Sequence, residues 1–147
     1  MSYLLDTNVV SELRKRDRAN VHLRGWFDTV ESHELFLSVV TVGELRRGIE
    51  VLGRRDTTAA AAISRWLRTL IEGFGDRVLA IDRPVAEEWG RLTASPGISP
   101  VDGLLAATAR VHRLTLVTRN VKDVRHVDVH VVDPFVATSS ITRAATP

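Results

Sequence analysis

Short apolar runs alternate with longer amphipathic stretches along this chain. The first four runs are almost continuously hydrophobic, which is typical of strands buried on both faces of a parallel sheet. In the fifth, Val127, Val129 and Val131 alternate with polar residues, as in a strand with one exposed face. The pattern predicts an α/β fold with a central parallel sheet of about five strands flanked by helices. The predicted strands are 3–5, 35–39, 78–81, 114–117 and 127–132.

The longer stretches predict helices, two of which follow one another without a strand between them. In the second of these, apolar residues recur at three- and four-residue spacing, which places them on one helical face: Ile63, Trp66, Leu67, Leu70 and Ile71. We therefore expect a helical hairpin that protrudes from the regular alternation. A small, polar stretch at 137–147 predicts a flexible C-terminal tail behind a domain of residues 1–136. The predicted helices are 8–16, 20–31, 42–53, 57–73, 84–94 and 100–112.

The amino-acid composition excludes several kinds of functional site but says less about the fold. With 147 residues the chain is most simply one domain, and the lack of cysteine excludes a disulfide framework, a thiolate metal site and a cysteine nucleophile. No apolar run approaches the ~20 residues that a membrane helix needs, and the first residues do not read as a signal peptide. We therefore expect a cytoplasmic protein that does not contact a membrane.

Four acids stand where predicted strands end or where the following helices begin: Asp6, Glu44, Asp102 and Asp123. The carboxyl ends of parallel strands share one edge of a sheet, which is where ligands bind in open α/β folds. Carboxylates brought together at that edge would need a cation between them. The pattern thus predicts a metal site.

Helix capping is a competing explanation for these acids. The segment Thr41-Val42-Gly43-Glu44 matches a capping box, Ser99 precedes Asp102 by three residues, and Asn120 does the same for Asp123. Asp82 also follows a predicted strand, and we interpret it as a plain N-cap. A strand-end position therefore does not by itself establish a site.

Asp6 differs from the other acids because Thr7 and Asn8 follow it and are both able to cap the next helix. We therefore expect Asp6 to have no capping role. Two carboxylates ~5 Å apart repel by roughly 3 kcal/mol at an effective dielectric constant of ~20, so a cation or raised pKa values would be needed. Ligands that are all oxygen favour Mg²⁺ or Mn²⁺ over Zn²⁺.

Four motifs in order resemble the PIN-domain family, and within it the VapC-type toxins of bacterial type II toxin–antitoxin pairs, including their FitB-like relatives. The resemblance covers positions 3 to 135. It departs at Val124, where relatives often carry an aromatic residue, which affects packing more than chemistry. The motifs are Asp6-Thr7-Asn8, Thr41-Val42-Gly43-Glu44-Leu45, the run from Asp102 to Ala109, and Thr118-Arg119-Asn120-Val121-Lys122-Asp123.

The resemblance implies a metal-dependent endoribonuclease that uses a metal-activated water. Asp6, Glu44, Asp102 and Asp123 would form an acidic pocket for one or two Mg²⁺ or Mn²⁺ ions. The polar neighbours that would orient them are Thr7, Asn8, Thr118 and Asn120. Candidates for contact with the RNA backbone, which could instead face solvent or an acidic partner, are Arg46, Arg47, Arg119 and Lys122.

The resemblance also implies partners. It predicts a homodimer, a cognate VapB-type antitoxin whose C-terminal segment lies across the active-site groove, and a larger toxin–antitoxin assembly. Two alternatives remain open: a catalytically idle PIN module that only binds, and a phosphatase of the haloacid-dehalogenase kind. The phosphatase family requires a second aspartate two residues after the first, where this chain has Asn8.

Overall fold

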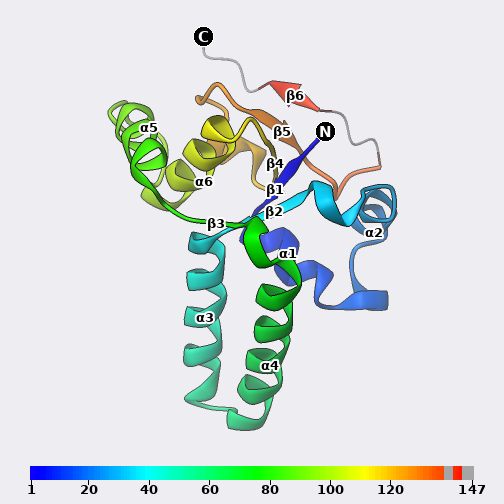
Figure 1. Cartoon of the computed structure of the whole chain (residues 1–147). Coiled ribbons are helices and arrows are strands. Elements are labelled where there is room, and N and C mark those ends of the chain that lie inside the picture. Colours follow the sequence, from blue (N-terminus) through cyan, green and yellow to red (C-terminus); the bar gives the residue numbers. More distant parts are fainter. Residues whose placement is uncertain (138–140, 144–147) are drawn as a thin grey trace.

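The computed structural model describes residues 1–137 and 141–143, and its centre is a mostly parallel sheet (Figure 1). The strand order is β3-β2-β1-β4-β5-β6. The first five pair in parallel, as predicted, and β6 pairs antiparallel with β5. The strands are β1 (Tyr3–Leu5), β2 (Leu35–Ser38), β3 (Val78–Leu79), β4 (Thr115–Val117), β5 (His130–Val132) and β6 (Thr142–Arg143).

Within the part of the chain that the structure describes, six α-helices and four short 3-10 helices connect the strands. The α-helices are α1 (Thr7–Leu13), α2 (Val21–Phe27), α3 (Val39–Gly53), α4 (Thr57–Phe74), α5 (Arg83–Thr93) and α6 (Pro100–Val111). The 3-10 helices are η1 (Arg16–Arg18), η2 (Ser32–Glu34), η3 (Gly75–Arg77) and η4 (Val121–Val124). Within the described residues, no helix is long and apolar enough to cross a membrane.

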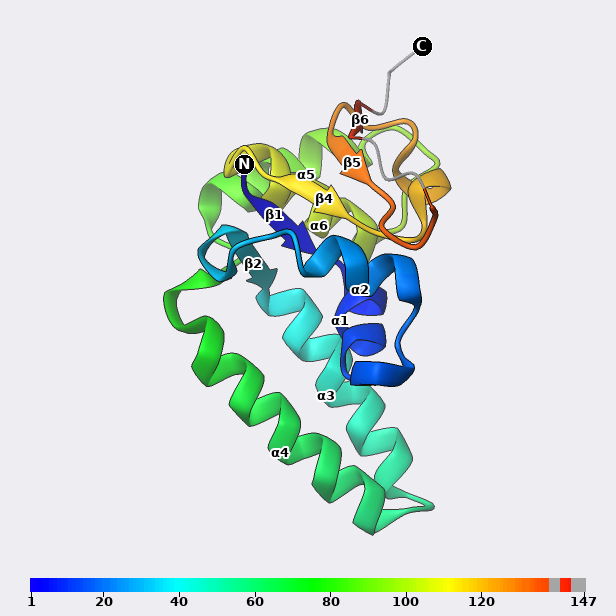
Figure 2. The ribbon, with the colours of Figure 1, turned by 90° about the vertical axis from the view of Figure 1, so that its right-hand side faces the viewer.

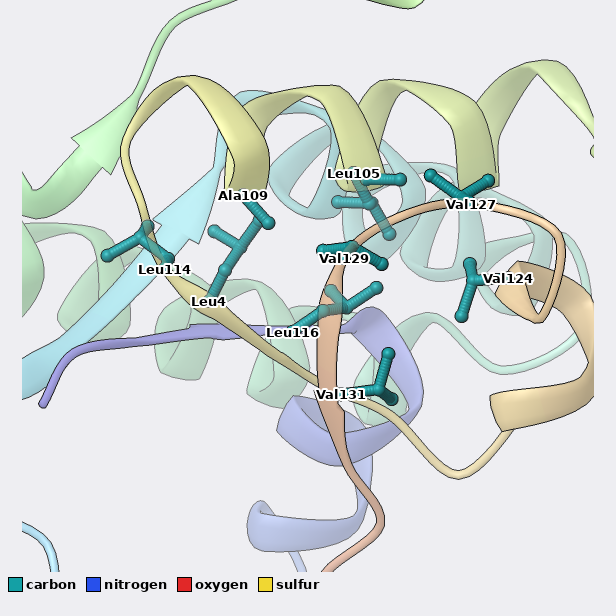
Figure 3. Packing of buried hydrophobic residues seen from close by; sticks show 10 residues of the cluster. Leu4, Leu105, Ala109, Leu114, Leu116, Val124, Val127, Val129 and Val131 are labelled. Atoms are coloured by element: carbon teal, nitrogen blue, oxygen red, sulfur yellow. The ribbon is translucent and has the colours of Figure 1, made fainter. Parts of the chain in front are cut away.

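Helices cover both faces of the sheet, so each central strand contributes to two cores. On one face Leu4 and Leu116 pack with Leu105 of α6 (Figure 3). On the other face Leu5 packs with Val9 of α1 and with other apolar side chains. Neighbouring residues of β1 thus point to opposite cores, which explains why the strand reads as a continuous hydrophobic run.

The α3–α4 pair projects away from the sheet as a helical hairpin, as predicted (Figures 1 and 2). Its own small core is built on Ile49, Ala60 and Leu67, with Ile63 and Trp66 packed against it. Here α4 presents its apolar face to α3, as its spacing predicted. α3 begins at Val39, directly after the last residue of β2, so no loop separates the hairpin from the carboxyl edge of the sheet.

Several element boundaries differ from the sequence prediction. The predicted helix 20–31 ends at Phe27, and the predicted strand 127–132 begins only at His130, although the alternating burial of 127–131 is as expected. The predicted tail 137–147 contains β6. Residues 138–140 and 144–147 of that tail lie outside the described residues, so its flexibility stays a prediction.

Candidate functional site

Asp6 lies where β1 ends and α1 begins, and the residue is only 9% exposed. Its backbone N–H donates to the carbonyl of Val117 on the neighbouring strand β4 at 2.9 Å. One carboxylate oxygen accepts from the Thr7 N–H at 2.6 Å, and the other accepts from Thr118 Oγ1 at 2.7 Å. Asp6 is therefore the N-cap of α1, and the expectation that it has no capping role is wrong. The segment offers three consecutive capping residue types, and the helix begins after the first of them.

Burial raises the pKa of Asp6 above its ordinary value, and the negative charges of Asp102 and Glu44 raise it further. The hydrogen bonds from Thr118 and Thr7 act in the opposite direction and do not cancel the rise. Two other carboxylates are thus close enough to disfavour the charged form of a third. The structure brings together three of the four predicted acids.

Glu44 is not part of a capping box. The helix α3 begins at Val39, three residues earlier than predicted, because Ser38 is its N-cap and accepts from the N–H of Val40 at 3.1 Å. Glu44 accordingly lies in the second turn, where no free backbone N–H needs it. It accepts a hydrogen bond from Thr7 Oγ1 at 2.6 Å instead.

The same Thr7 hydroxyl lies 3.3 Å from Thr41 Oγ1, so α1 and α3 meet at Thr7. Thr41 is fully buried and lies three residues before Glu44, on the same face of α3. Thr41 was expected to cap the helix, so its place beside Glu44 was not predicted. Its helical spacing from Glu44 was the available signal.

Asp102 lies in the first turn of α6 and is hydrogen bonded to the N-cap of that helix. Ser99 Oγ donates to Asp102 Oδ2 at 2.8 Å, and the Asp102 N–H donates to Ser99 Oγ at 3.2 Å. The capping explanation therefore holds for Asp102. It does not exclude the site, because the same carboxylate also acts on Asp6.

Asp123 is exposed on η4 and is not among the charges that raise the pKa of Asp6. A hydrogen-bonded path still leads from it to the site. Its N–H donates to the carbonyl of Asn120 at 3.0 Å, and the N–H of Asn120 donates to Thr118 Oγ1 at 3.0 Å. Asp123 thus stays at the margin of the three-acid group.

The three-acid group suits a metal ion by its donor chemistry more than by its arrangement. Within residues 1–137 and 141–143, no three His, Asp or Glu side chains are arranged to hold a metal ion. The donor chemistry nevertheless fits a hard cation, because the group offers only oxygen ligands. In addition, Asn8 Oδ1 is buried and has no hydrogen-bond partner among the described residues. No ion pair to Asp6, Glu44 or Asp102 occurs in that part of the chain.

The four basic residues proposed to contact RNA differ in whether other side chains already hold them. Arg46 donates to Ser64 Oγ at 3.1 Å and lies 3.8 Å from the Glu50 carboxylate, so it is directed along the hairpin. The Arg119 guanidinium lies 5.0 Å from the centre of the Phe135 ring. Arg47 and Lys122 are exposed on α3 and η4.

A cavity of about 640 Å³ lies apart from the acids between α1, α2 and α4. Leu5, Val10 and Leu70 are among its apolar lining residues, and none of the four acids lines it. Leu5, the last residue of β1, lines this cavity, and the next residue, Asp6, belongs to the group of acids. Its basic lining residues are Arg14, Arg16, Arg24 and Arg77, beside two acids, Asp17 and Asp28.

The PIN domain model matches residues 3–129, which is most of the chain. The chain belongs to the PIN domain family. This membership rejects the haloacid-dehalogenase alternative. Among curated relatives, the toxin FitB of Neisseria gonorrhoeae is 34% identical over 90% of this chain and 97% of its own length. The VapC ribonuclease Y4jK of Sinorhizobium fredii is 30% identical over 90% of this chain and 96% of its own length.

Solved PIN structures support the same assignment. The crystal structure of FitAcB from Neisseria gonorrhoeae superposes with a TM-score of 0.82 at 33% identity, covering 90% of this chain and 98% of that chain. A toxin–antitoxin complex from Klebsiella pneumoniae superposes with a TM-score of 0.70 at 25% identity, covering 90% and 98%. The PIN fold expected from the sequence is therefore confirmed, including its flanking helices.

Proposed function

We propose that this PIN-domain chain is a divalent-metal-dependent endoribonuclease and the toxin of a toxin–antitoxin pair. The observation that carries the proposal is the state of Asp6, a buried carboxylate whose pKa is raised by burial and by Asp102 and Glu44. A protein gains no stability from such a group, because three carboxylates that share one edge repel each other. A cation relieves that repulsion, and a perturbed acid of this kind is typical of a functional site.

Asp6 and Asp102 would hold the Mg²⁺ or Mn²⁺ ion most directly, with Glu44 beside them and Asp123 at the margin. When bound, the ion supplies an activated water and neutralises charge that develops on the scissile phosphate. Thr118 orients the Asp6 carboxylate through its 2.7 Å hydrogen bond, and Thr7 orients Glu44 through its 2.6 Å bond. Asn8 and Asn120 would complete the polar surroundings from α1 and from the turn before η4.

RNA must be attracted by residues around the acids, because the acids themselves repel phosphate. Arg119 and Lys122 follow β4 next to Thr118, and we propose them as the main contacts with the RNA backbone. Arg47 is exposed on α3, the helix that carries Glu44, and would add to this surface. Arg46 contributes less, since Ser64 and Glu50 already engage it.

The direct test is RNA cleavage by purified variants with and without chelator. We expect Mn²⁺-dependent cleavage of total RNA, abolished by EDTA and by Asp6→Ala or Asp102→Ala while the helical circular dichroism is kept. Asp82→Ala is the matched control, because Asp82 is also a strand-end acid but serves only to cap α5 through the N–H of Val85. Activity retained in EDTA, or in both site variants, would contradict the proposal. Antitoxin binding without any cleavage would instead favour the idle PIN module.

The antitoxin needs a binding surface beyond the acids that its C-terminal segment is expected to cover, and we propose the apolar cavity between α1, α2 and α4. It fits an apolar helix whose flanks carry acidic residues, because its walls are apolar and its four lining arginines outnumber its two lining acids. Arg14→Glu combined with Arg16→Glu should weaken antitoxin binding and leave cleavage unchanged. Arg54→Glu with Arg55→Glu, at the end of the α3–α4 hairpin, is the control and should change neither. The homodimer and the larger assembly belong to the same proposal and are tested by light scattering of the pair.

A further inference from the structure

The first turn of α6 is fixed in place by α5. Trp89 of α5 donates from its indole Nε1 to the carbonyl of Pro100, the first residue of α6, at 3.0 Å. Thr93, one turn further along α5, donates from Oγ1 to the carbonyl of Trp89 at 2.7 Å. Figure 1 shows the two helices side by side at one flank of the sheet. Asp102 lies two residues after the Pro100 carbonyl that Trp89 binds.

Gly103, directly after Asp102, lies against these two side chains. A Cβ atom at this position would come within 2.7 Å of Thr93 Cγ2 and within 3.2 Å of Trp89 Cδ1. Real Cβ atoms do not approach so closely, so any larger residue would force the helices apart. Neither neighbour yields easily, because both are held by hydrogen bonds and threonine is stiff about its χ1 angle. The glycine is buried, and its role here is to allow close approach.

The close packing determines where Asp102 stands. Its backbone position is set by Gly103 on one side and by the Trp89–Pro100 bond on the other, and its carboxylate by Ser99 Oγ at 2.8 Å. A helix shift of about 1 Å displaces a site residue enough to cost roughly 100-fold in rate. α6 has no other glycine, and the corresponding first turns of α1 and α3 have none.

We propose that Trp89, Thr93 and Gly103 are positioning residues that set the placement of Asp102 relative to Asp6 and thereby tune the affinity for the divalent cation. The inference rests on the proposed function, since it assumes that Asp102 is a metal ligand. It assigns a role to three residues that neither touch RNA nor hold the ion. They act through the backbone of α6.

The test is Mn²⁺ binding by the full-length chain, followed by electron paramagnetic resonance of the free ion and without substrate. Gly103→Ala should weaken Mn²⁺ binding about tenfold, the loss typical when a residue that supports a ligand is changed. Thr93→Ser removes the Cγ2 atom but keeps the hydroxyl bond to Trp89. The double variant Gly103→Ala with Thr93→Ser should therefore recover most of the affinity. In cleavage assays, raising the Mn²⁺ concentration should restore the activity of Gly103→Ala, which a general folding defect would not allow.

Gly90→Ala is the matched control on α5, because nothing lies within 4 Å of a Cβ atom there, and it should bind Mn²⁺ as the parent does. If Gly103→Ala does not fold, Trp89→Phe removes only the indole donor and should still weaken binding severalfold. Parent-like Mn²⁺ affinity in folded Gly103→Ala, or in Trp89→Phe, overturns the inference and leaves the proposed function intact. A parent protein that binds no Mn²⁺ overturns both.

Discussion

Thr118 and Asp6, which lie 112 positions apart in the chain, are joined by a buried 2.7 Å hydrogen bond from hydroxyl to carboxylate. They stand at the ends of β4 and β1, which are neighbours at the centre of the sheet. The bond therefore ties the two halves of the chain together at the site. It also lowers the pKa of a carboxyl that burial and two nearby acids push upward.

Thr118→Val should destabilise the fold by about 1–3 kcal/mol at pH 7, the cost of a lost hydrogen bond to a buried charged group. The valine keeps the shape and removes the donor, so the pKa of Asp6 rises further. The folded carboxyl then prefers its proton, and the penalty is present in full above its pKa and shrinks as the pH falls through it. Urea denaturation of parent and variant between pH 7 and pH 4 measures the difference.

Thr108→Val is the control for that series. Thr108 is also fully buried, and its hydroxyl donates to the carbonyl of Leu104 at 2.8 Å within α6, not to a carboxylate. It should lose a similar or smaller amount of stability, with no dependence on pH over this range. An equal pH dependence in both variants would disconnect the effect from Asp6.

Asp6→Asn should stabilise the metal-free protein at pH 7 and abolish cleavage. Because the folded pKa of Asp6 lies above its ordinary value of 3.8, the folded protein holds a proton that the unfolded chain has released. The parent therefore loses stability as the pH rises from the ordinary pKa through the folded pKa of Asp6, and the cost is complete above the folded pKa. In EDTA at pH 7 the variant should have a higher melting temperature than the parent. The difference should disappear near pH 4 and below.

Asp82→Asn is the comparison for this prediction, because Asp82 caps α5 and asparagine caps about as well as aspartate. Its melting temperature should follow that of the parent at every pH. A destabilised Asp6→Asn protein at pH 7 would mean that its hydrogen bonds outweigh the burial and repulsion of the charge.

The sequence predicted the parallel sheet, the hairpin and the three acids that lie together. The errors in its predicted helix starts have a common physical origin. Ser38 and Thr41 are both hydroxyl residues able to start α3, and the helix begins after Ser38. Because the helix starts there, Glu44 lies in the second turn and has no capping role. Asp6 was wrongly excluded as a cap for the same reason, since local propensity does not choose among adjacent capping residues. The place of Asp123 depends on a 3-10 turn, for which hydrophobic spacing carries no signal.

Arg113→Gly should stabilise the protein by about 0.5–1 kcal/mol. Arg113 has a φ of 55°, in the left-handed region, and directly follows His112, the C-cap of α6. The N–H of Leu114 donates to the carbonyl of Ala109 at 2.8 Å and that of Arg113 to Arg110 at 3.2 Å, which together make a Schellman motif. Glycine adopts this conformation without strain. Guanidinium denaturation tests it.

The reverse kind of change, Gly97→Ala, should lower the stability instead of raising it. Gly97 has a φ of 112°, and a Cβ there would meet only His126 Cδ2 at an ordinary 3.6 Å, so any loss reports backbone strain. We expect it to destabilise by about 1 kcal/mol or more. If both variants shifted stability in the same direction, backbone conformation would not be the cause.

Arg119→Ala and Lys122→Ala should each weaken RNA binding and make it less sensitive to salt. Each phosphate contact with single-stranded RNA contributes roughly −0.7 to the slope of log affinity against log salt concentration, so each variant should flatten the slope by about that amount. The measurement is fluorescence anisotropy with a labelled single strand, in an Asp102→Asn background that prevents cleavage. Arg46→Ala should have a smaller effect because Ser64 and Glu50 hold its side chain, and Arg55→Ala at the hairpin end should have none. An affinity that does not change with salt in the parent background would contradict the backbone role of all four basic residues.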